Sequence, residues 1–365
     1  MAAAIFTGQA AFAQDVTLPK TMVWTSYDLG STGYVEASAM ADALDKMFGA
    51  TVRITPSGTG IGRLLPLKTG RANFGFMGNE ILFASEGTYE FAARDWGPQE
   101  TRVLLGRPAA VGLITGLDTD IQTVADVRGK KVGYVQANPS IDMNIAAELA
   151  FGGLTKDDIE EVLYPGYGAM VQGFIAGEID VVTVTPTVAA LREAEGGRGV
   201  RWLDMPGSDA EGWARVRESS SVFSPTSMTV GVSISETDPA DLLGYRYPQL
   251  STYASVSEDE VYNLMKALDE SYDLFKDGNQ VMARWNITDS GASPAGAPFH
   301  PGAIKYLREK GVWDAEDDAW NEARLAQLAV IKTAWDEATA KADVEKVSDA
   351  DWPAYWEAYK AEMVE

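Results

Sequence analysis

The chain has 365 residues, of which 46% are hydrophobic and 23% charged, with a formal net charge of −23 at pH 7 and no cysteine. This length predicts about two domains with ample core, and so acidic a surface repels phosphate backbones, which argues against nucleic acid as a partner. The lack of cysteine excludes disulfides, cysteine-ligated zinc, iron–sulfur clusters and thiol catalysis.

The N-terminus resembles the end of a secretory signal. A small-residue apolar stretch closes on Ala11-Phe12-Ala13, an A-x-A pattern typical of a signal-peptidase site. Because a charged n-region is missing, we expect residues 1–14 to be a signal-peptide remnant, with a disordered Ala-rich tail as the alternative. No other stretch of the sequence approaches the ~18–20 consecutive apolar residues of a membrane-spanning helix. We therefore expect a soluble, exported protein of the periplasm.

Strand and helix patterns alternate from Thr21 onward. Short apolar runs predict strands, and one-sided apolar spacing predicts the helices between them. Strands that alternate with helices indicate a mainly parallel α/β sheet. In chain order we predict a strand at 21–25, a helix at 34–48, a strand at 50–55, a helix at 61–69 and a strand at 74–77.

A second unit with the same order follows two apolar runs near residues 103–115. Ligands of α/β sheets bind at the carboxyl ends of the strands, so two similar lobes of this kind predict a ligand-binding cleft between them. The predicted elements of this unit are a strand at 131–135, a helix from Asn138 to Ala150, a strand at 160–165, a helix at 168–176 and a strand at 179–185.

The rest of the chain is predicted to return to the first lobe and to end in helices. We expect strands at 229–235 and 251–257 and a helix at 259–276. Apolar residues at helical spacing around residues 325–335 indicate a helix packed on the core, with a partner-binding face as the alternative. The predicted division is residues 15–112 and 226–312 for lobe one, 113–225 for lobe two, and 313–365 for C-terminal helices packed on the lobes.

Signatures of enzymes and cofactor sites are weak. The run Gly58-Thr-Gly-Ile-Gly is G-x-G-x-G, an imperfect form of a dinucleotide-binding loop, with Glu80 about 20 positions on as its acidic partner. The single histidine, His300, cannot form a two-histidine metal site, and we expect it to be structural. No G-x-S-x-G elbow and no phosphate-binding P-loop motif occurs in the sequence. We therefore predict a non-enzymatic protein without cofactor or metal.

Three polar loops each lead into a predicted helix: Gly30–Gly33, Ser57–Gly60 and Asn138–Ser140. Each offers backbone N–H groups at the positive end of a helix dipole, together with a hydroxyl or an amide. Ordinary helix caps are the alternative. Arg63 and Arg107 add guanidinium groups suited to a carboxylate. Tyrosines near these loops, at 27, 34, 134 and 167, are expected either to stack on a ligand or to belong to the core.

Four segments together resemble the TAXI family, the extracytoplasmic solute-binding subunits of tripartite (TRAP) transporters. They are GSTGYVEASAMADAL, TPSGTGIGRLLPLKTGRANFGFM, the pair VADVRGKKVGYVQ and FIAGEIDVVTVTP, and PFHPGAIKYLREKGVW. The last is similar to the H-P-G-A block of the family and is the most specific. The resemblance covers most of the chain from Thr21 to Trp313.

The resemblance implies an α/β two-lobe periplasmic-binding-protein (Venus flytrap) fold with a hinge and C-terminal helices. It implies a cleft for an organic acid or amino acid, lined in lobe one by Ser31, Thr32, Gly58, Thr59 and Asn79, and in lobe two by Asn138, Ser140, Tyr167 and Thr185. The chain departs from the family pattern at Gly60 and Arg63, where Ser and Asn are usual, and at Asn138–Ser140, where a G-S-G turn is usual. An arginine at position 63 favours an anionic ligand held from lobe one.

We therefore predict a periplasmic solute-binding protein that captures a small carboxylate-bearing solute and delivers it to a fused TRAP membrane permease. The alternatives are a binding protein of a sensor or ABC importer, or a periplasmic enzyme with His300 as its base. The predicted ligand-binding residues are Ser31, Thr32, Tyr34, Ser57, Gly58, Thr59, Arg63, Asn79, Arg107, Asn138, Ser140, Tyr167 and Thr185.

Overall fold

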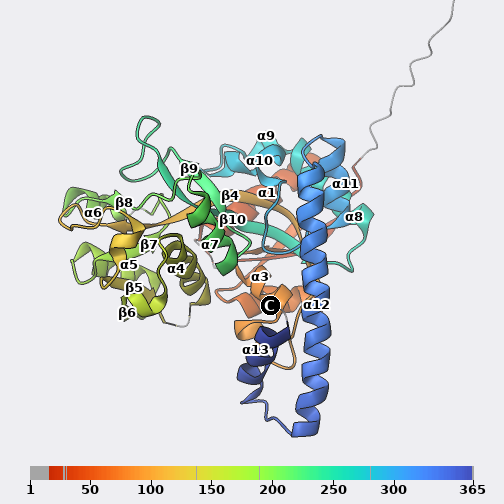
Figure 1. The fold of residues 1–365 in the computed structure, drawn as a ribbon. Coiled ribbons are helices and arrows are strands. Elements are labelled where there is room, and N and C mark those ends of the chain that lie inside the picture. The colour runs from red at the N-terminus through yellow and green to blue at the C-terminus, as the bar shows by residue number, and fades with distance from the viewer. Residues whose placement is uncertain are drawn as a thin grey trace, which may run out of the picture.

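The computed structural model describes residues 16–27, 29, 31–136, 138–188, 190–279 and 281–363. The predicted signal-peptide remnant at residues 1–14 lies outside this range. The described chain forms two α/β lobes side by side and a C-terminal helical arm that extends beyond the first lobe (Figure 1).

The first lobe is built on strands in the order β2-β1-β3-β10-β4. Both neighbours of β1 are parallel to it, whereas β10 runs antiparallel to β3 and β4. The strands are β1 (Thr21–Ser26), β2 (Thr51–Pro56), β3 (Phe74–Met77), β4 (Thr101–Thr115) and β10 (Ala240–Tyr253). The first three helices are α1 (Thr32–Phe48), α2 (Gly60–Lys68) and α3 (Glu80–Glu86).

Local chemistry sets the limits of α1. Ser31 caps its N-terminus, because the Ser31 Oγ accepts a hydrogen bond from the Tyr34 N–H at 3.2 Å. Gly49 ends the helix with φ 65°, a left-handed conformation that glycine adopts without strain. The helix buries Met40 and Leu44 against the sheet, and its first turn is left free to face the second lobe.

The second lobe continues from the far end of β4 in the order β4-β7-β5-β6, with β8 also paired to β4. Its strands are β5 (Lys131–Val135), β6 (Glu160–Tyr164), β7 (Val181–Val184) and β8 (Arg201–Trp202). Its helices are α4 (Pro139–Phe151), α5 (Tyr167–Ile175), α6 (Leu191–Gly196) and α7 (Ala210–Ser219).

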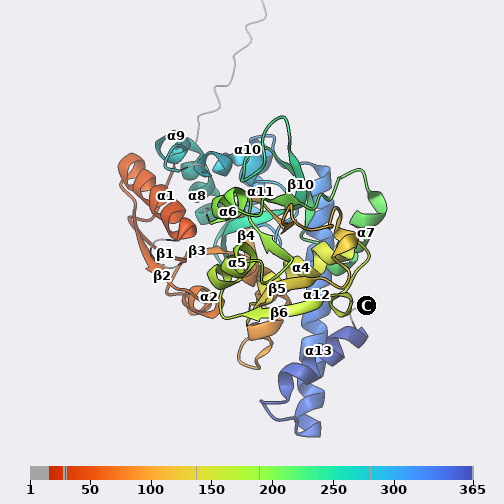
Figure 2. The ribbon, with the colours of Figure 1, turned by 90° about the vertical axis from the view of Figure 1, so that its left-hand side faces the viewer.

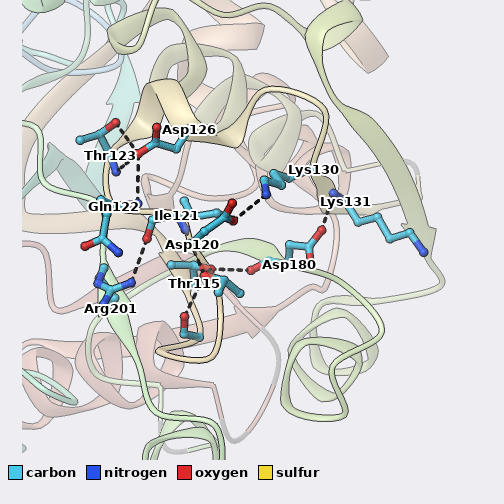
Figure 3. A network of polar contacts seen from close by, with 12 residues as sticks. Thr115, Asp120, Ile121, Gln122, Thr123, Asp126, Lys130, Lys131, Asp180 and Arg201 are labelled. Carbon is cyan, nitrogen blue, oxygen red and sulfur yellow. Dashed lines mark hydrogen bonds and ion pairs between the residues drawn. The ribbon is translucent and has the colours of Figure 1, made fainter.

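A network of polar contacts fixes the end of the second lobe that lies away from the first (Figure 3). The Asp180 carboxylate accepts the Lys131 N–H at 2.9 Å, and the Asp180 carbonyl accepts from the Thr115 hydroxyl at 3.0 Å. Arg201 donates to the Ile121 carbonyl at 2.9 Å. β5 and β7 are parallel, so their carboxyl ends lie at the opposite edge of the sheet, where Val184 and Thr185 line the cavity described below.

Two long strands, β4 and β10, join the lobes. They pair antiparallel along most of their length, with a register shift between Arg246 and Gln249. Each strand contributes to both lobes: β4 pairs with β7 at one end, and β10 pairs with β3 at the other. β9 (Ser224–Met228) extends this two-stranded ribbon beside β10. In Figure 2 the second lobe faces the viewer, and the first lobe lies behind it.

Short helices cover the first lobe, and a long one leaves it. The helices that follow β10 in the chain are α8 (Glu258–Glu270), α9 (Tyr272–Phe275), α10 (Ile287–Ser290), α11 (Pro301–Glu309), the long α12 (Ala315–Glu345) and α13 (Trp352–Met363). Single 3₁₀ turns are η1 (Tyr89–Ala92), η2 (Val124–Val127), η3 (Lys156–Asp158) and η4 (Met282–Trp285). We call α12 and α13 the C-terminal arm. A separate apolar cluster around Trp335, Trp352 and Trp356 holds the arm against η1.

Several sequence predictions of secondary structure were wrong. Residues 229–235 form turns with isolated bridges instead of a strand. The predicted helix at 259–276 is two helices that meet at Ser271. The sheet is mixed rather than mainly parallel, because both joining strands run antiparallel to their neighbours.

Candidate ligand-binding cleft

A cavity of about 710 Å³ lies between the two lobes. Its walls come from the starts of α1, α3, α4 and α5, from the end of β7 with the residues after it, from β4 and β10, and from the segment at 279–284. This volume falls within the roughly 300–1,000 Å³ typical of small-molecule sites.

Helix N-termini from both lobes face the cavity. Ser31 and Thr32 begin α1, and Asn138 and Ser140 begin α4. The Asn138 Oδ1 accepts the Ile141 N–H at 3.2 Å, so Asn138 caps its helix and lines the cavity at once. The N-terminal ends of α-helices carry partial positive charge and favour anions.

Two arginines line the cavity. Arg107 of β4 is 7% exposed, and one edge of its guanidinium donates to Glu36, with Nη2 at 3.1 Å from Oε1. Glu36 is fully buried and also accepts the Trp285 Nε1–H at 2.7 Å. Arg284 of η4 makes no ion pair with any described residue. Burial, and then the neighbouring Arg107, lower its pKa.

Acidic groups are missing from the described part of the cavity lining, which contains neither Asp nor Glu. Glu148 lies buried beside it, and its Oε1 accepts from the Thr183 hydroxyl at 2.9 Å. Burial raises the pKa of Glu148 to about 8, against the opposing effect of that hydrogen bond. The carboxyl is therefore mostly protonated at pH 7. Glu36 offsets the charge of Arg107, so among the described lining residues Arg284 supplies the positive charge that no ion pair offsets.

Four tyrosines also line the cavity: Tyr27, Tyr167, Tyr245 and Tyr247. Tyr245 and Tyr247 are stacked, with ring centroids 5.8 Å apart and an interplanar angle of 26°. Tyr27 meets Tyr247 edge-on at 5.9 Å. Burial raises the pKa of all four, that of Tyr167 to about 12. Their hydroxyls are thus protonated at neutral pH and able to donate hydrogen bonds.

Arg63 does not reach the cavity. Its Nε and Nη2 both donate to the Glu80 Oε1, at 2.9 and 2.7 Å, and its Nη1 donates to the Ser57 carbonyl at 2.9 Å. Its guanidinium lies 4.1 Å from the centre of the Tyr27 ring. The residue that sequence reasoning placed against the ligand is instead buried beneath a tyrosine of the cavity wall. Arg63 thus lies outside the described lining, and its contacts are with Glu80, Ser57 and Tyr27.

The structure brings together most of the other predicted residues. Those that line the cavity are Ser31, Thr32, Asn79, Arg107, Asn138, Ser140, Tyr167 and Thr185. Those outside its lining, besides Arg63, are Tyr34, Ser57, Gly58 and Thr59. The predicted glycine loop is a helix start, in which the Thr59 hydroxyl accepts the Gly62 N–H at 3.0 Å. Across the cleft, the amides of Asn79 and Asn144 meet at 3.5 Å.

Sequence reasoning missed Arg284, Tyr245 and Tyr247 as lining residues. The two tyrosines stand two apart on β10, a spacing that places both on one face of a strand. Recognition of that strand would have identified them. Arg284 lies in a short 3₁₀ turn without a motif, and only the tertiary fold places it in the cleft.

His300 is buried and contacts backbone groups through both ring nitrogens. Its Nδ1 accepts the Gly302 N–H at 3.1 Å, its Nε2 is 3.0 Å from the Val256 carbonyl oxygen, and it is 1% exposed. The residue thus caps α11, away from the cavity. Within the described ranges, no group of three or more metal-ligating side chains is gathered. Nor does any helix there have the length and apolar character to span a bilayer.

Two α/β lobes joined by paired crossing strands, with a ligand-sized cavity between them, define the fold of periplasmic solute-binding proteins, as predicted. The chain belongs to the NMT1-like family, whose model matches residues 29–311.

Solved structures similar to this chain include two sulfonate-binding proteins. The periplasmic aliphatic sulphonate binding protein SsuA from Escherichia coli is 17% identical, with a TM-score of 0.45 over 84% of this chain and 85% of that one. The alkanesulfonate-binding protein SsuA from Xanthomonas axonopodis pv. citri, bound to MOPS, is 13% identical, with a TM-score of 0.41 over 82% and 96%. An ancestral arginine-binding protein bound to arginine is 14% identical, with a TM-score of 0.40 over 74% and 99%.

Proposed function

We propose that this protein is an extracytoplasmic solute-binding protein that captures a small organic anion, with a carboxylate as its acidic group. One observation carries the proposal: among the described residues of the cavity lining, the charged ones are Arg107 and Arg284, in a strongly acidic chain. Guanidinium groups match the planar geometry of carboxylates. The helix starts at Ser31 and Asn138 add N–H donors from opposite lobes.

Capture proceeds by closure of the lobes around the anion. The two rigid bodies are residues 15–112 with 226–312, and residues 113–225, with 313–365 attached to the first. The bend occurs where β4 and β10 pass between the lobes, near the register shift after Arg246. Hinges of this kind absorb closure in a few residues of the connecting segments. Ligand contacts from both lobes then stabilise the closed form.

The proposed partner is a fused TRAP membrane permease, and the proposed location is the periplasm. Both rest on the four sequence segments that resemble the TAXI family and on the A-x-A pattern before Gln14. An ABC importer or a sensor is the alternative partner. Uptake of the solute into vesicles that contain the candidate permease distinguishes these partners. TRAP-type uptake follows an ion gradient, and ABC-type uptake requires ATP.

A thermal-shift screen followed by calorimetry tests the proposal. Carboxylates, sulfonates, neutral amino acids and cationic amines are each added to the purified protein. A carboxylate at 100 times its Kd stabilises the native state by about 2.7 kcal/mol. Arg284→Gln should weaken its binding at least tenfold, whereas Arg53→Gln, on the exposed side of β2, should not. A cation as the only ligand, or no ligand at all, would refute the proposal.

A further inference from the structure

Three tyrosines of the cleft form a row of neighbouring rings, and Tyr167 lines the same cavity from the second lobe; we call the four the aromatic wall. Tyr27 belongs to the first lobe, Tyr245 and Tyr247 to the joining strand β10, and Tyr167 to the start of α5 in the second lobe. Rings of the first three meet in sequence, at 5.9 and 5.8 Å between centroids. Phe223 continues the row at 6.0 Å from Tyr245. Tyr167 lines the same cavity from the start of α5.

The arginines lie at this wall. Tyr245 is paired with Ala109 across the β10–β4 ladder. Side chains two apart on a strand share a face, so Arg107 lies on the same face as Ala109 and Tyr245. The positive charge of Arg107 opposes the rise in the pKa of Tyr245 and Tyr247 and lowers the pKa of Arg284. Ala109, with a small side chain, lines the cavity together with Arg107 and both stacked tyrosines.

Apolar side chains also line part of the cavity, among polar ones from the helix starts, and the space is large. Ile141, Val184, Pro186 and Met228 line it from the second-lobe side and β9. A cavity of about 710 Å³ exceeds what a four- or five-carbon diacid fills. Tyrosine rings offer flat faces, and aromatic ligands prefer offset or edge-on contact with them.

We propose that the bound anion is an arylcarboxylate: an acid whose aromatic ring packs against Tyr245 and Tyr167 while its carboxylate meets Arg107 and Arg284. This inference rests on the proposed function and specifies its substrate class. The tyrosine hydroxyls remain protonated and donate to polar substituents of the ring. A ring held between Tyr167 of one lobe and Tyr245 of the joining strand also couples binding to closure.

Calorimetry with a matched pair of acids tests this inference. 3-Phenylpropionate and 3-cyclohexylpropionate share charge, chain length and ring size and differ in aromaticity. We expect the phenyl acid to bind about tenfold more tightly than the cyclohexyl acid, and more tightly than succinate or glutamate, because each aromatic contact adds to the burial of area.

Variants of the tyrosines test whether the preference for the phenyl acid comes from the aromatic wall. Tyr245→Leu should abolish the phenyl preference, Tyr245→Phe should retain it, and Tyr253→Leu, on the same strand outside the cavity, should leave it intact. Melting curves confirm that each variant is folded. Equal or tighter binding of the cyclohexyl acid, succinate or glutamate overturns the inference and leaves the anion-binding function standing. A phenyl preference that survives Tyr245→Leu also overturns it. If no anion binds, the proposed function fails and the inference fails with it.

Discussion

The side chain of Glu148 carries a carboxyl group whose charged form is disfavoured by burial. It is fully buried, and its Oε2 has no hydrogen-bond partner among the described residues. Burial raises its pKa from 4.5 to about 8. Below pH 4.5 both folded and unfolded chains hold the proton. Between pH 4.5 and 8 only the folded chain holds it, so rising pH favours unfolding.

Glu148→Gln should remove this pH dependence. We expect the variant to gain stability relative to the natural protein by roughly 4–5 kcal/mol between pH 4 and pH 8.5, the free energy equivalent to the shift in pKa. Urea denaturation at a series of pH values measures the difference. Glu211→Gln, at an exposed position of α7, serves as the control. Parallel stability profiles for Glu148→Gln and the natural protein would contradict the expectation.

Arg63 and Glu80 form a buried ion pair behind Tyr27. Arg63→Met leaves the Glu80 carboxylate buried without its partner and should cost about 3–5 kcal/mol, whereas the double variant Arg63→Met/Glu80→Leu should recover most of that loss. Chemical denaturation measures both. Arg128→Met breaks the exposed pair with Asp158 and should cost less than about 1 kcal/mol. A double variant as unstable as the single one would disprove the pairing argument.

The arm illustrates how an element is stabilised by specific packing. Trp352 and Trp356 donate their indole N–H groups to the carbonyls of Ala92 and Gly87 at 2.8 and 2.7 Å. Arg324 and Lys360 both pair with Glu86 of α3. The arm is therefore bound to the first lobe by apolar burial, hydrogen bonds and charge together.

Trp356→Ala should release α13 from the first lobe. Loss of a fully buried tryptophan costs about 3–5 kcal/mol, and protease cleavage between α12 and α13 should become faster. Affinity for the cleft ligand should stay unchanged, since the arm does not line that cavity. Val344→Ala, which truncates a side chain that is 83% exposed, is the control. Cleavage at the natural rate in Trp356→Ala would show that the tryptophan does not hold the arm.

Elements bounded by strong local signals were predictable from sequence. β3 and β5 have the predicted limits, because each is a short apolar run between polar or glycine-rich turns. Only the last three residues of β10 fall within a predicted strand, the one at 251–257, because Tyr245, Arg246 and Pro248 interrupt the apolar pattern before it. At the site, cap residues predicted the helix starts that line the cavity. The partner of Arg63 could not be predicted, because Glu80 lies on another helix and only folding brings the two together.

At the scale of the whole molecule, the proposed function depends on relative movement of the lobes. The chain lacks cysteine, so pairs of introduced cysteines can carry fluorophores without interference. Leu65 of α2 and Leu163 of β6 are exposed on different lobes, at 46% and 63%. Energy transfer between labels there should rise on ligand binding. The pair Leu65 and Met47 within the first lobe should show no change. Constant transfer at saturating ligand for both pairs would contradict closure.

The position of β10 also has a consequence for the order in which the protein assembles. The strands of the second lobe lie between residues 101 and 202, so that lobe has its sheet complete early as the chain emerges. The first sheet has a vacancy between β3 and β4 that only residues 240–253 fill. Until they arrive, the edges of β3 and β4 are unpaired and prone to aggregation. The first lobe therefore completes its sheet only after the later half of the chain has joined it.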